Sequence, residues 1–196
     1  MKKCFPLFTI LYSTFLIWLK RGVDKIIAED KKKSVPDIFQ SISIIIAARN
    51  EIKNLPNLLN SLACLDYPQD KYEIIIVNDH SNDGSKEYLA TQKNIPNLKI
   101  INFYRETPPL TGKKAALQQG IEQAQYEILA FTDADCMVPV YWLQEINRSF
   151  TKETDYLLSY SVIKRKPDDS IIRLKNFERS VNYALAAAGL YYKIPF

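Results

Sequence analysis

The sequence predicts an α/β fold, with a mostly parallel sheet flanked by helices and one hydrophobic helix before it at the N-terminus. Short β-branched runs alternate with segments of helical periodicity from residue 41 onward, and no hairpin signal separates one apolar run from the next. Such alternation is typical of doubly wound sheets. With 196 residues, 47% of them apolar, the chain is long enough to bury one sizeable core.

The N-terminal segment predicts a membrane anchor over residues 1–20. Cys4 to Leu19 carries no charge and would form a helix about 24 Å long, against a hydrocarbon core of roughly 30 Å. Basic residues are denser after this run than before it, which predicts a single-pass protein of the cell membrane with its catalytic domain in the cytoplasm. A signal peptide and a buried first helix of the domain are the alternatives.

Residues 21–40 are charged and predict a basic tether between this anchor and a domain at 41–196. The net charge of +4 gathers around the N-terminal run and is not spread over the domain. This placement favours a membrane surface as a partner over nucleic acid. The basic residues that flank the run are Lys2, Lys3, Lys20, Arg21, Lys25, Lys31, Lys32 and Lys33.

The first strand of the domain is expected over 42–48. This nearly unbroken β-branched run is typical of a central parallel strand that is covered on both faces. Residues 51–65 follow as a helix, because four leucines recur there at helical spacing before Pro68. Residues 72–77 then repeat the strand signature.

The rest of the domain continues this alternation. Turn residues at 83–85 lead into a short helix, and a third apolar strand comes next. Small and apolar residues at helical spacing then predict a longer helix before a fourth strand. The expected segments, in order, are helix 86–93, strand 98–103, helix 112–125, strand 127–132, helix 139–150, strand 156–164 and helix 168–190.

Two carboxylates directly follow the strand expected over 127–132. Asp133 and Asp135 are separated by Ala134, and alternate residues of an extended chain point the same way. A turn at this place lets both carboxylates approach one hard cation, which prefers oxygen ligands. The alternative is a pair of solvated turn acids that cap the helix after Pro139.

Polar clusters recur at other strand and helix ends of the predicted domain. They are Arg49 to Glu51 after the first strand, Asn78 to Ser85 after the second, and Gly112 to Leu117 at the start of the helix before the fourth. Right-handed crossovers place the carboxyl ends of parallel strands on one side, so the clusters are expected to meet. Each alone is also explained as a helix cap, a turn or a solvated lysine. No G-x-G-x-x-G or Walker loop occurs, so nucleotide binding depends on acids and a metal.

In this order and spacing, residues 41 to about 190 resemble the family 2 glycosyltransferases, which have the GT-A fold, a Rossmann-like sheet. Ser43 to Glu51 resembles the first strand and Arg-Asn-Glu turn of that family, and Val77 to Ser81 its second-strand acid. Gly112 to Leu117 resembles the Gly-Lys helix start, and Asp133 to Asp135 the DXD metal motif. The sequence departs from the commonest pattern at two positions, with Ala47 in place of a proline and Asn78 in place of a first aspartate.

The resemblance implies an inverting enzyme that transfers a sugar from a nucleotide diphosphate sugar, with a UDP-sugar as the expected donor, to a lipid-linked or polysaccharide acceptor. Mg²⁺ or Mn²⁺ is the implied cofactor. The resemblance also implies a role for each site residue. Asp79 is expected to contact the uracil or ribose, and the nucleoside is expected to contact Ala47, Ala48, Arg49 and Glu51. Lys113 is expected on the nucleotide side of the pocket. Asp133 is expected to contact the ribose or sugar and also the metal, and Asp135 is expected to bind the metal.

Neither the general base that inversion requires nor the Gln-x-x-Arg-Trp acceptor motif of the family is found in the sequence. The base is therefore expected beyond Phe196, and no catalytic residue is assigned. The chain resembles the donor-binding half of a transferase, truncated at its C-terminus, so a catalytically incomplete nucleotide-sugar-binding module is the alternative function. The apolar stripe of the helix expected over 168–190 predicts self-association through that helix.

Overall fold

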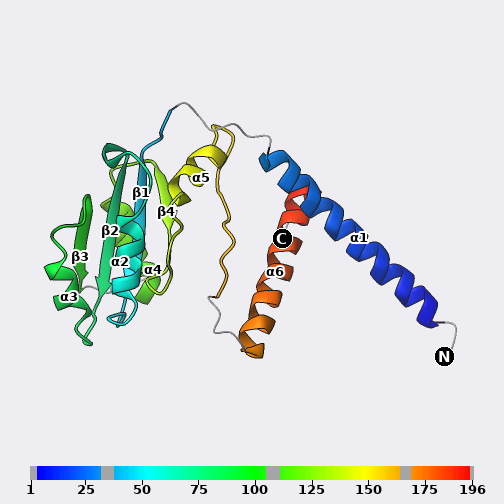
Figure 1. Ribbon diagram of the computed structural model, residues 1–196, viewed down its shortest axis with the longest axis horizontal. Helices are drawn as coiled ribbons and strands as arrows, with labels where there is room; N and C mark the ends of the chain where they lie inside the picture. Colours follow the sequence, from blue (N-terminus) through cyan, green and yellow to red (C-terminus); the bar gives the residue numbers. More distant parts are fainter. Residues whose placement is uncertain (1–3, 32–37, 105–110, 164–168, 195–196) are drawn as a thin grey trace. The chain divides into compact units, whose positions relative to one another are not determined.

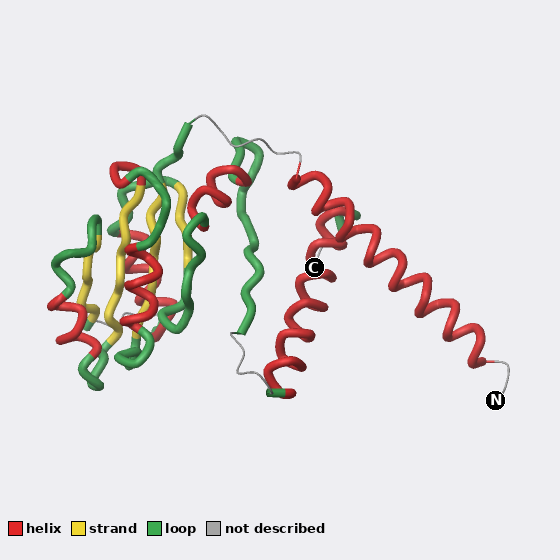
Figure 2. The backbone as a smooth tube through the Cα atoms, in the orientation of Figure 1, coloured by secondary structure: helices red, strands yellow, loops and turns green. Residues whose placement is uncertain are grey.

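The computed structural model describes residues 4–31, 38–104, 111–163 and 169–194 (Figures 1 and 2). The chain forms two compact units. One comprises residues 35–151 and holds a sheet with its helices, and the other comprises residues 1–34 and 152–196 and holds two long helices. Each unit is described by itself below.

The sheet of the first unit has four parallel strands in the order β3-β2-β1-β4. Their bounds are β1 Ile42–Ala48, β2 Tyr72–Asp79, β3 Leu98–Phe103 and β4 Ile128–Phe131. β1 and β2 are buried along nearly their whole length, as their β-branched runs predict. The expected α/β fold with a parallel sheet flanked by helices is confirmed.

Helices cover both faces of this sheet (Figure 1). The even-numbered isoleucines of β1 and β2 pack with leucines of α2 and α3 and with Leu143 of α5. Ile75 and Val77, which point the other way, pack with Ala115 and Ala116 of α4. The helices are α2 Leu55–Ala63, α3 Ser85–Thr91, α4 Gly112–Glu122 and α5 Trp142–Ser149, and a 3₁₀ turn, η1, spans Gln69–Lys71.

The strand order reverses between β1 and β4. The first two crossovers place β2 and β3 successively on one side of β1, whereas β4 pairs with its other side. In open α/β sheets, ligands bind at the carboxyl ends of the strands next to such a reversal, because the connections diverge there and leave a crevice. The topology therefore places the candidate site between the ends of β1 and β4.

A buried polar network lies at the amino ends of the central strands β1 and β2, opposite the cleft end. Glu73 Oε1 accepts hydrogen bonds of 2.6 Å from Ser43 Oγ and from the backbone N–H of Gln125. Ser43 Oγ in turn accepts a bond of 3.1 Å from the N–H of Tyr126. Buried polar groups are costly unless paired, and these bonds pair them while they anchor the turn between α4 and β4.

The second unit is built on α1 Cys4–Lys31 and α6 Ser170–Tyr191, which cross at small residues. A Cβ added to Gly22 would lie 2.8 Å from Cα and Cβ of Ala188, so the absent side chain permits the close approach. Trp18 stacks on Tyr192, with the ring centroids 4.8 Å apart. α1 runs past residue 20, so residues 21–31 of the expected tether are helical, and residues 32–37 lie outside the described part.

The strand expected over 156–164 is wrong for residues 156–163, and residue 164 lies outside the described residues. Among the described residues, no strand pairs with this segment. The Asn176 amide of α6 binds both backbone groups of Ile163 instead, accepting from its N–H at 2.8 Å and donating to its carbonyl at 3.0 Å. A helix side chain thus takes the place of the neighbouring strand that the alternating pattern suggested.

Several helices also begin later than their sequence pattern. α2 begins at Leu55 and not at residue 51, because residues 50–54 form a turn that bonds to the loop after β2. α5 begins at Trp142, after the turn that follows Pro139.

No helix in the described ranges combines the length and the apolar character needed to cross a membrane. The expected single-pass anchor is not supported by this finding.

Candidate functional site

A cleft of about 230 Å³ lies at the carboxyl ends of the strands, where the strand order reverses. Its lining comes from the carboxyl ends of β1 and β2, from the segments that follow β1 and β4, and from the first turn of α4. The lining residues are Ala47, Ala48, Arg49, Glu51, Asp79, Lys113, Asp133, Ala134 and Asp135. All eight residues predicted from the sequence are among them, so segments far apart in the chain meet as expected.

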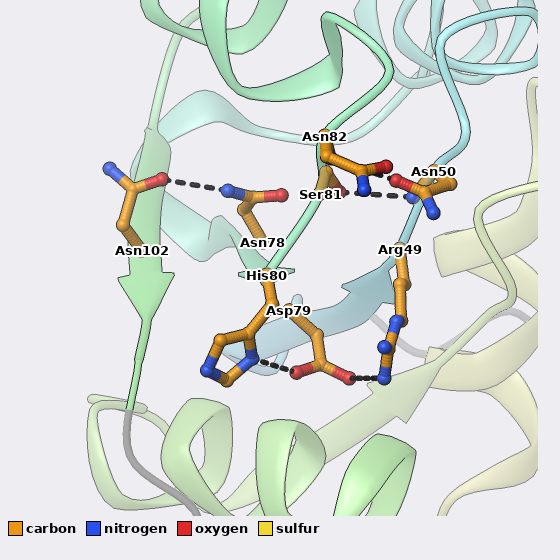
Figure 3. Close-up of polar contacts among 8 residues, drawn as sticks. All are labelled: Arg49, Asn50, Asn78, Asp79, His80, Ser81, Asn82 and Asn102. Carbon is orange, nitrogen blue, oxygen red and sulfur yellow. Dashed lines mark hydrogen bonds and ion pairs between the residues drawn. The ribbon is translucent and has the colours of Figure 1, made fainter.

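Asp79, the last residue of β2, is the buried acid of the cleft, with a side chain only 3% exposed. Its Oδ1 lies 2.7 Å from His80 Nδ1, and its Oδ2 lies 3.8 Å from Arg49 Nη1 (Figure 3). An ionised carboxylate only accepts hydrogen bonds, so His80 Nδ1 carries the proton. The two neighbours hold the carboxylate in one orientation at the wall of the cleft.

The loops after β1 and β2 are joined by hydrogen bonds between side chain and backbone. The Asn50 N–H donates to Ser81 Oγ at 3.0 Å, and the Asn82 N–H donates to Asn50 Oδ1 at 2.9 Å (Figure 3). Asn50 and His80 both have positive φ, 57° and 53°, a region that asparagine and histidine enter more readily than most residues. These two bends turn the chain so that Arg49 and Asp79 lie side by side.

Asp83 adds further hydrogen bonds between the loops after β1 and β2, outside the lining of the cleft. Its carboxylate accepts from the Ser85 hydroxyl at 2.6 Å and from the N–H of Ile52 at 3.0 Å. The hydrogen bond from Ser85, with those from the backbone, holds the pKa of Asp83 below its ordinary value. The Ser85 hydroxyl also accepts from the N–H of Glu51 at 2.9 Å, so the position of Glu51 is fixed by the loop after β2.

The acid pair lies at the other wall of the cleft. Lys113 Nζ is 2.6 Å from Asp133 Oδ1, and both side chains are more than half exposed. Asp135 is exposed and accepts a weak bond of 3.6 Å from the Cys136 thiol. Burial, followed by the Asp135 charge, raises the pKa of that thiol, which disfavours the nucleophilic thiolate.

The metal ligands available from this part of the chain are few. Within residues 4–31, 38–104, 111–163 and 169–194, no three His, Cys, Asp or Glu side chains gather as a metal site. Asp133 and Asp135 both line the cleft and are exposed. Two carboxylates suit a cation that takes its other ligands from phosphate and water, as Mg²⁺ does.

Asn78, where the sequence departs from the family pattern, lies outside the lining of the cleft. It is 1% exposed, and its Nδ2 donates to Asn102 Oδ1 at 2.9 Å (Figure 3). Its own Oδ1 has no hydrogen-bond partner among the described residues. Successive residues of a strand point to opposite faces, and of this pair Asp79 is the one that lines the cleft.

The role of His80 was not predicted from the sequence. The residue lies in a turn motif that the sequence does reveal, and its adjacency to Asp79 is the only available signal. The direction of its ring depends on the positive φ, which the sequence pattern does not show.

The family model described as glycosyl transferase family 2 matches residues 43–196, which is most of the chain. The chain belongs to glycosyltransferase family 2. Members of this family are enzymes of glycosyl transfer, which confirms the expected enzyme class.

This family 2 chain is similar to curated proteins over part of their length. Glycosyltransferase AglE of Haloferax volcanii is 38% identical over 105 residues, which are 53% of this chain and 33% of that protein. Beta-monoglucosyldiacylglycerol synthase of a Nostoc species is 32% identical over 123 residues, 62% of this chain and 26% of that protein. The matched chain therefore spans a third or less of these relatives.

A solved structure supports the fold of the family 2 chain. The mannosyltransferase PcManGT from Pyrobaculum calidifontis, in complex with GDP-Man and Mn²⁺, superposes with a TM-score of 0.55 at 24% identity. The match covers 76% of this chain and 43% of that one. At this identity the likeness concerns the fold, and it agrees with the expected GT-A architecture.

Proposed function

We propose that this chain binds a nucleotide diphosphate sugar, a UDP-sugar first of all, and activates it for inverting, metal-assisted transfer to a lipid-linked or polysaccharide acceptor. The observation that carries the proposal is the convergence of Asp79, Lys113 and the acid pair on one cleft at the strand-order reversal. Such a crevice is where open α/β sheets bind ligands. The name of the Nostoc relative, a glucosyldiacylglycerol synthase, supports a lipid acceptor.

The two walls of the cleft suit the two ends of a nucleoside diphosphate. The base and ribose belong beside Asp79, Arg49 and Glu51, with the backbone of Ala47 and Ala48 as the floor. The buried carboxylate of Asp79 is a fixed acceptor for the N–H of a base.

The diphosphate belongs beside Lys113 and the acid pair. The Lys113 ammonium is exposed enough to reach a phosphate while it stays close to Asp133. Asp133 then lies near the ribose or sugar, and Asp135 is the residue that would hold Mg²⁺ or Mn²⁺, with Asp133 as a second ligand. When bound, such a cation acts as a Lewis acid that offsets the charge of the leaving nucleoside diphosphate. No residue of the cleft is assigned as the general base.

We also propose that the N-terminal segment holds the protein at a membrane, with the catalytic unit on the cytoplasmic side. Apolar side chains of α1 such as Phe8, Leu11 and Phe15 are 68%, 62% and 45% exposed. Lys20 and Arg21 follow them, and basic residues beside an apolar segment favour anionic lipid surfaces. Sedimentation with anionic liposomes tests this proposal, and failure of the chain to sediment with them would reject it.

The donor proposal is tested by calorimetric titration of the chain with UDP, with and without Mn²⁺, next to an assay of UDP-sugar hydrolysis. The expected result is saturable binding of one UDP per chain that Mn²⁺ strengthens. Binding that is absent, or that Mn²⁺ leaves unchanged, contradicts the proposal. Binding without hydrolysis favours the alternative of a nucleotide-sugar-binding module.

A further inference from the structure

We infer that His80 sets the base preference of the cleft, because its ring occupies one of the two acceptor oxygens of Asp79 and leaves one for the nucleobase. A site with one free acceptor favours a base that presents one N–H donor, as uracil does, over guanine, which presents a ring N–H beside an amino group. This inference rests on the proposed function, and it adds a specificity-determining residue that does not itself line the cleft.

The His80 ring is held in place by its surroundings. The residue has a φ of 53°, and its ring meets Phe103 and Tyr104 edge-on, with centroid separations of 5.9 and 6.1 Å. Figure 3 shows the ring and Arg49 on opposite sides of the Asp79 carboxylate. The ring therefore contacts Oδ1 from the side away from Arg49, and the backbone bend fixes that direction.

Because Asp79 is buried, the hydrogen bond from His80 to Oδ1 limits the acceptor sites that remain for a ligand. An exposed carboxylate has about four lone-pair sites and loses little when one is used. The Asp79 side chain is 3% exposed, so the protein closes most of those sites. With Oδ1 bonded to His80 at 2.7 Å, Oδ2 is the oxygen left for a ligand, and Arg49 Nη1 lies 3.8 Å from it as a donor.

One acceptor, Asp79 Oδ2, and one donor, Arg49, complement the hydrogen-bonding edge of uracil better than that of guanine. Uracil presents one ring N–H between two carbonyl oxygens, so Oδ2 takes the N–H while Arg49 serves a neighbouring oxygen. Guanine presents a ring N–H beside an amino group, two adjacent donors that match both oxygens of a free carboxylate. With Oδ1 occupied, the guanine amino group loses its acceptor, and an unpaired donor in a buried site is costly.

Two variants separate the hydrogen bond from the packing of the ring. His80→Gly removes the donor and keeps the positive φ accessible. His80→Asn also tolerates this φ, and its amide nitrogen lies about where Nδ1 lies, so it can donate to Oδ1 again. Both variants lose the contacts with Phe103 and Tyr104, so the difference between them reports the bond alone.

The measurement is the ratio of the dissociation constants of GDP and UDP, each titrated with Mn²⁺ into the full chain. The wild type is expected to prefer UDP. His80→Gly is expected to lower the ratio of the GDP to the UDP dissociation constant about fivefold, which corresponds to one ordinary hydrogen bond. His80→Asn is expected to restore the wild-type ratio. Asn97→Gly is the matched control, because Asn97 also has a positive φ, 60°, but lies directly before β3 and outside the cleft. Its ratio should equal that of the wild type.

A second measurement needs no variant. His80 is the only histidine, so its ring nitrogens give a unique ¹⁵N signal, which is expected to show a proton on Nδ1 with and without UDP. An unprotonated Nδ1, a wild type that prefers GDP, or a His80→Gly ratio that is unchanged or equal to that of His80→Asn overturns the inference. If neither nucleotide binds the wild type saturably, the proposed function itself fails, and the inference falls with it.

Discussion

The side chains of the cleft divide into those that the protein already pairs and those that it leaves open. Asp79 is held by His80 and Arg49, and Asp133 by Lys113. Asp135 has only the weak contact from Cys136 among the described residues, and it is exposed. Of the cleft acids near Lys113, Asp135 is therefore the one most available to a cation.

Asp135→Asn should consequently abolish the effect of Mn²⁺ on UDP binding and reduce any donor hydrolysis on the order of 100-fold, because an amide is a poor substitute for a charged ligand. UDP binding without metal should change little. Calorimetry with Asp70→Asn as the control, an exposed aspartate outside the cleft, checks both points. Mn²⁺ that strengthens UDP binding to Asp135→Asn as it does to the wild type would remove Asp135 from the metal site.

Asp83 should make folding stability dependent on pH in the acid range. Its hydrogen bonds with Ser85 and the backbone lower its pKa below 3.8 in the folded chain. The ionised form is thus favoured by folding, so its contribution is complete above the pKa of the unfolded chain and is lost as the pH falls through the folded pKa. Urea unfolding at several pH values should show that the free energy of unfolding decreases less at acid pH for Asp83→Ala than for the wild type.

The control for this comparison is Asp70→Ala, which should follow the wild-type curve. If Asp83→Ala and the wild type lose the same stability between neutral and acid pH, the hydrogen bonds of Asp83 do not stabilise the ionised form.

At the scale of elements, α4 links the sheet to the cleft. Lys113 lies in its first turn, and Gly120 near its end lies so close to β1 that an added Cβ would be 2.5 Å from Ile45 Cγ2 and 3.3 Å from Val77 Cγ2. Real side chains do not make contacts of 2.5 Å, so a residue larger than glycine requires a shift of the Ile45 side chain or of the helix. The helix that carries Lys113 is therefore positioned by the absence of a side chain.

Gly120→Ala should lower the free energy of unfolding by about 1–3 kcal/mol and weaken UDP binding, because overpacking displaces α4 and its lysine. Gln118→Ala, at an exposed position of the same helix, should do neither. Denaturant unfolding and nucleotide titration of both variants test this. A Gly120→Ala variant that is as stable as Gln118→Ala would show that α4 tolerates the added methyl group.

The elements predicted correctly are those that burial dictates. β1 and β3 have the expected bounds, and the cleft contains every predicted residue, because parallel strands bring their carboxyl ends to one edge. Two of the errors share a cause, namely partners distant in the chain. Asn176 binds the backbone of Ile163 in place of a strand, and Asp83 and Ser85 hold the turn that delays α2. Sequence periodicity does not predict such contacts between distant residues.

At the scale of the whole molecule, α6 of the helical unit presents a stripe of exposed apolar side chains. Ile171, Leu174 and Phe177 recur at helical spacing on α6 and are 66%, 67% and 66% exposed. A stripe of this kind is typical of a contact surface. We predict that the chain self-associates through it, as the sequence pattern suggested.

Replacement of all three stripe residues by glutamine should weaken that self-association about tenfold or more, because each buried side chain of this size contributes about 1.5–3 kcal/mol. Lys175→Gln and Glu178→Gln on the same helix should have no such effect. Sedimentation equilibrium over a range of concentrations measures it. A wild-type chain that stays monomeric, or a triple variant that associates equally well, would reject the stripe as a contact.

The claim on which the whole account depends is that one cleft receives the nucleotide at Asp79 and its diphosphate at Lys113 and Asp135. A crystal structure of the chain grown with UDP and Mn²⁺ tests it most directly. We expect the base against Asp79 and Arg49, and the diphosphate between Lys113 and a cation bound to Asp135. A nucleotide bound elsewhere, or one in this cleft with its phosphates turned away from Lys113 and Asp135, would contradict it.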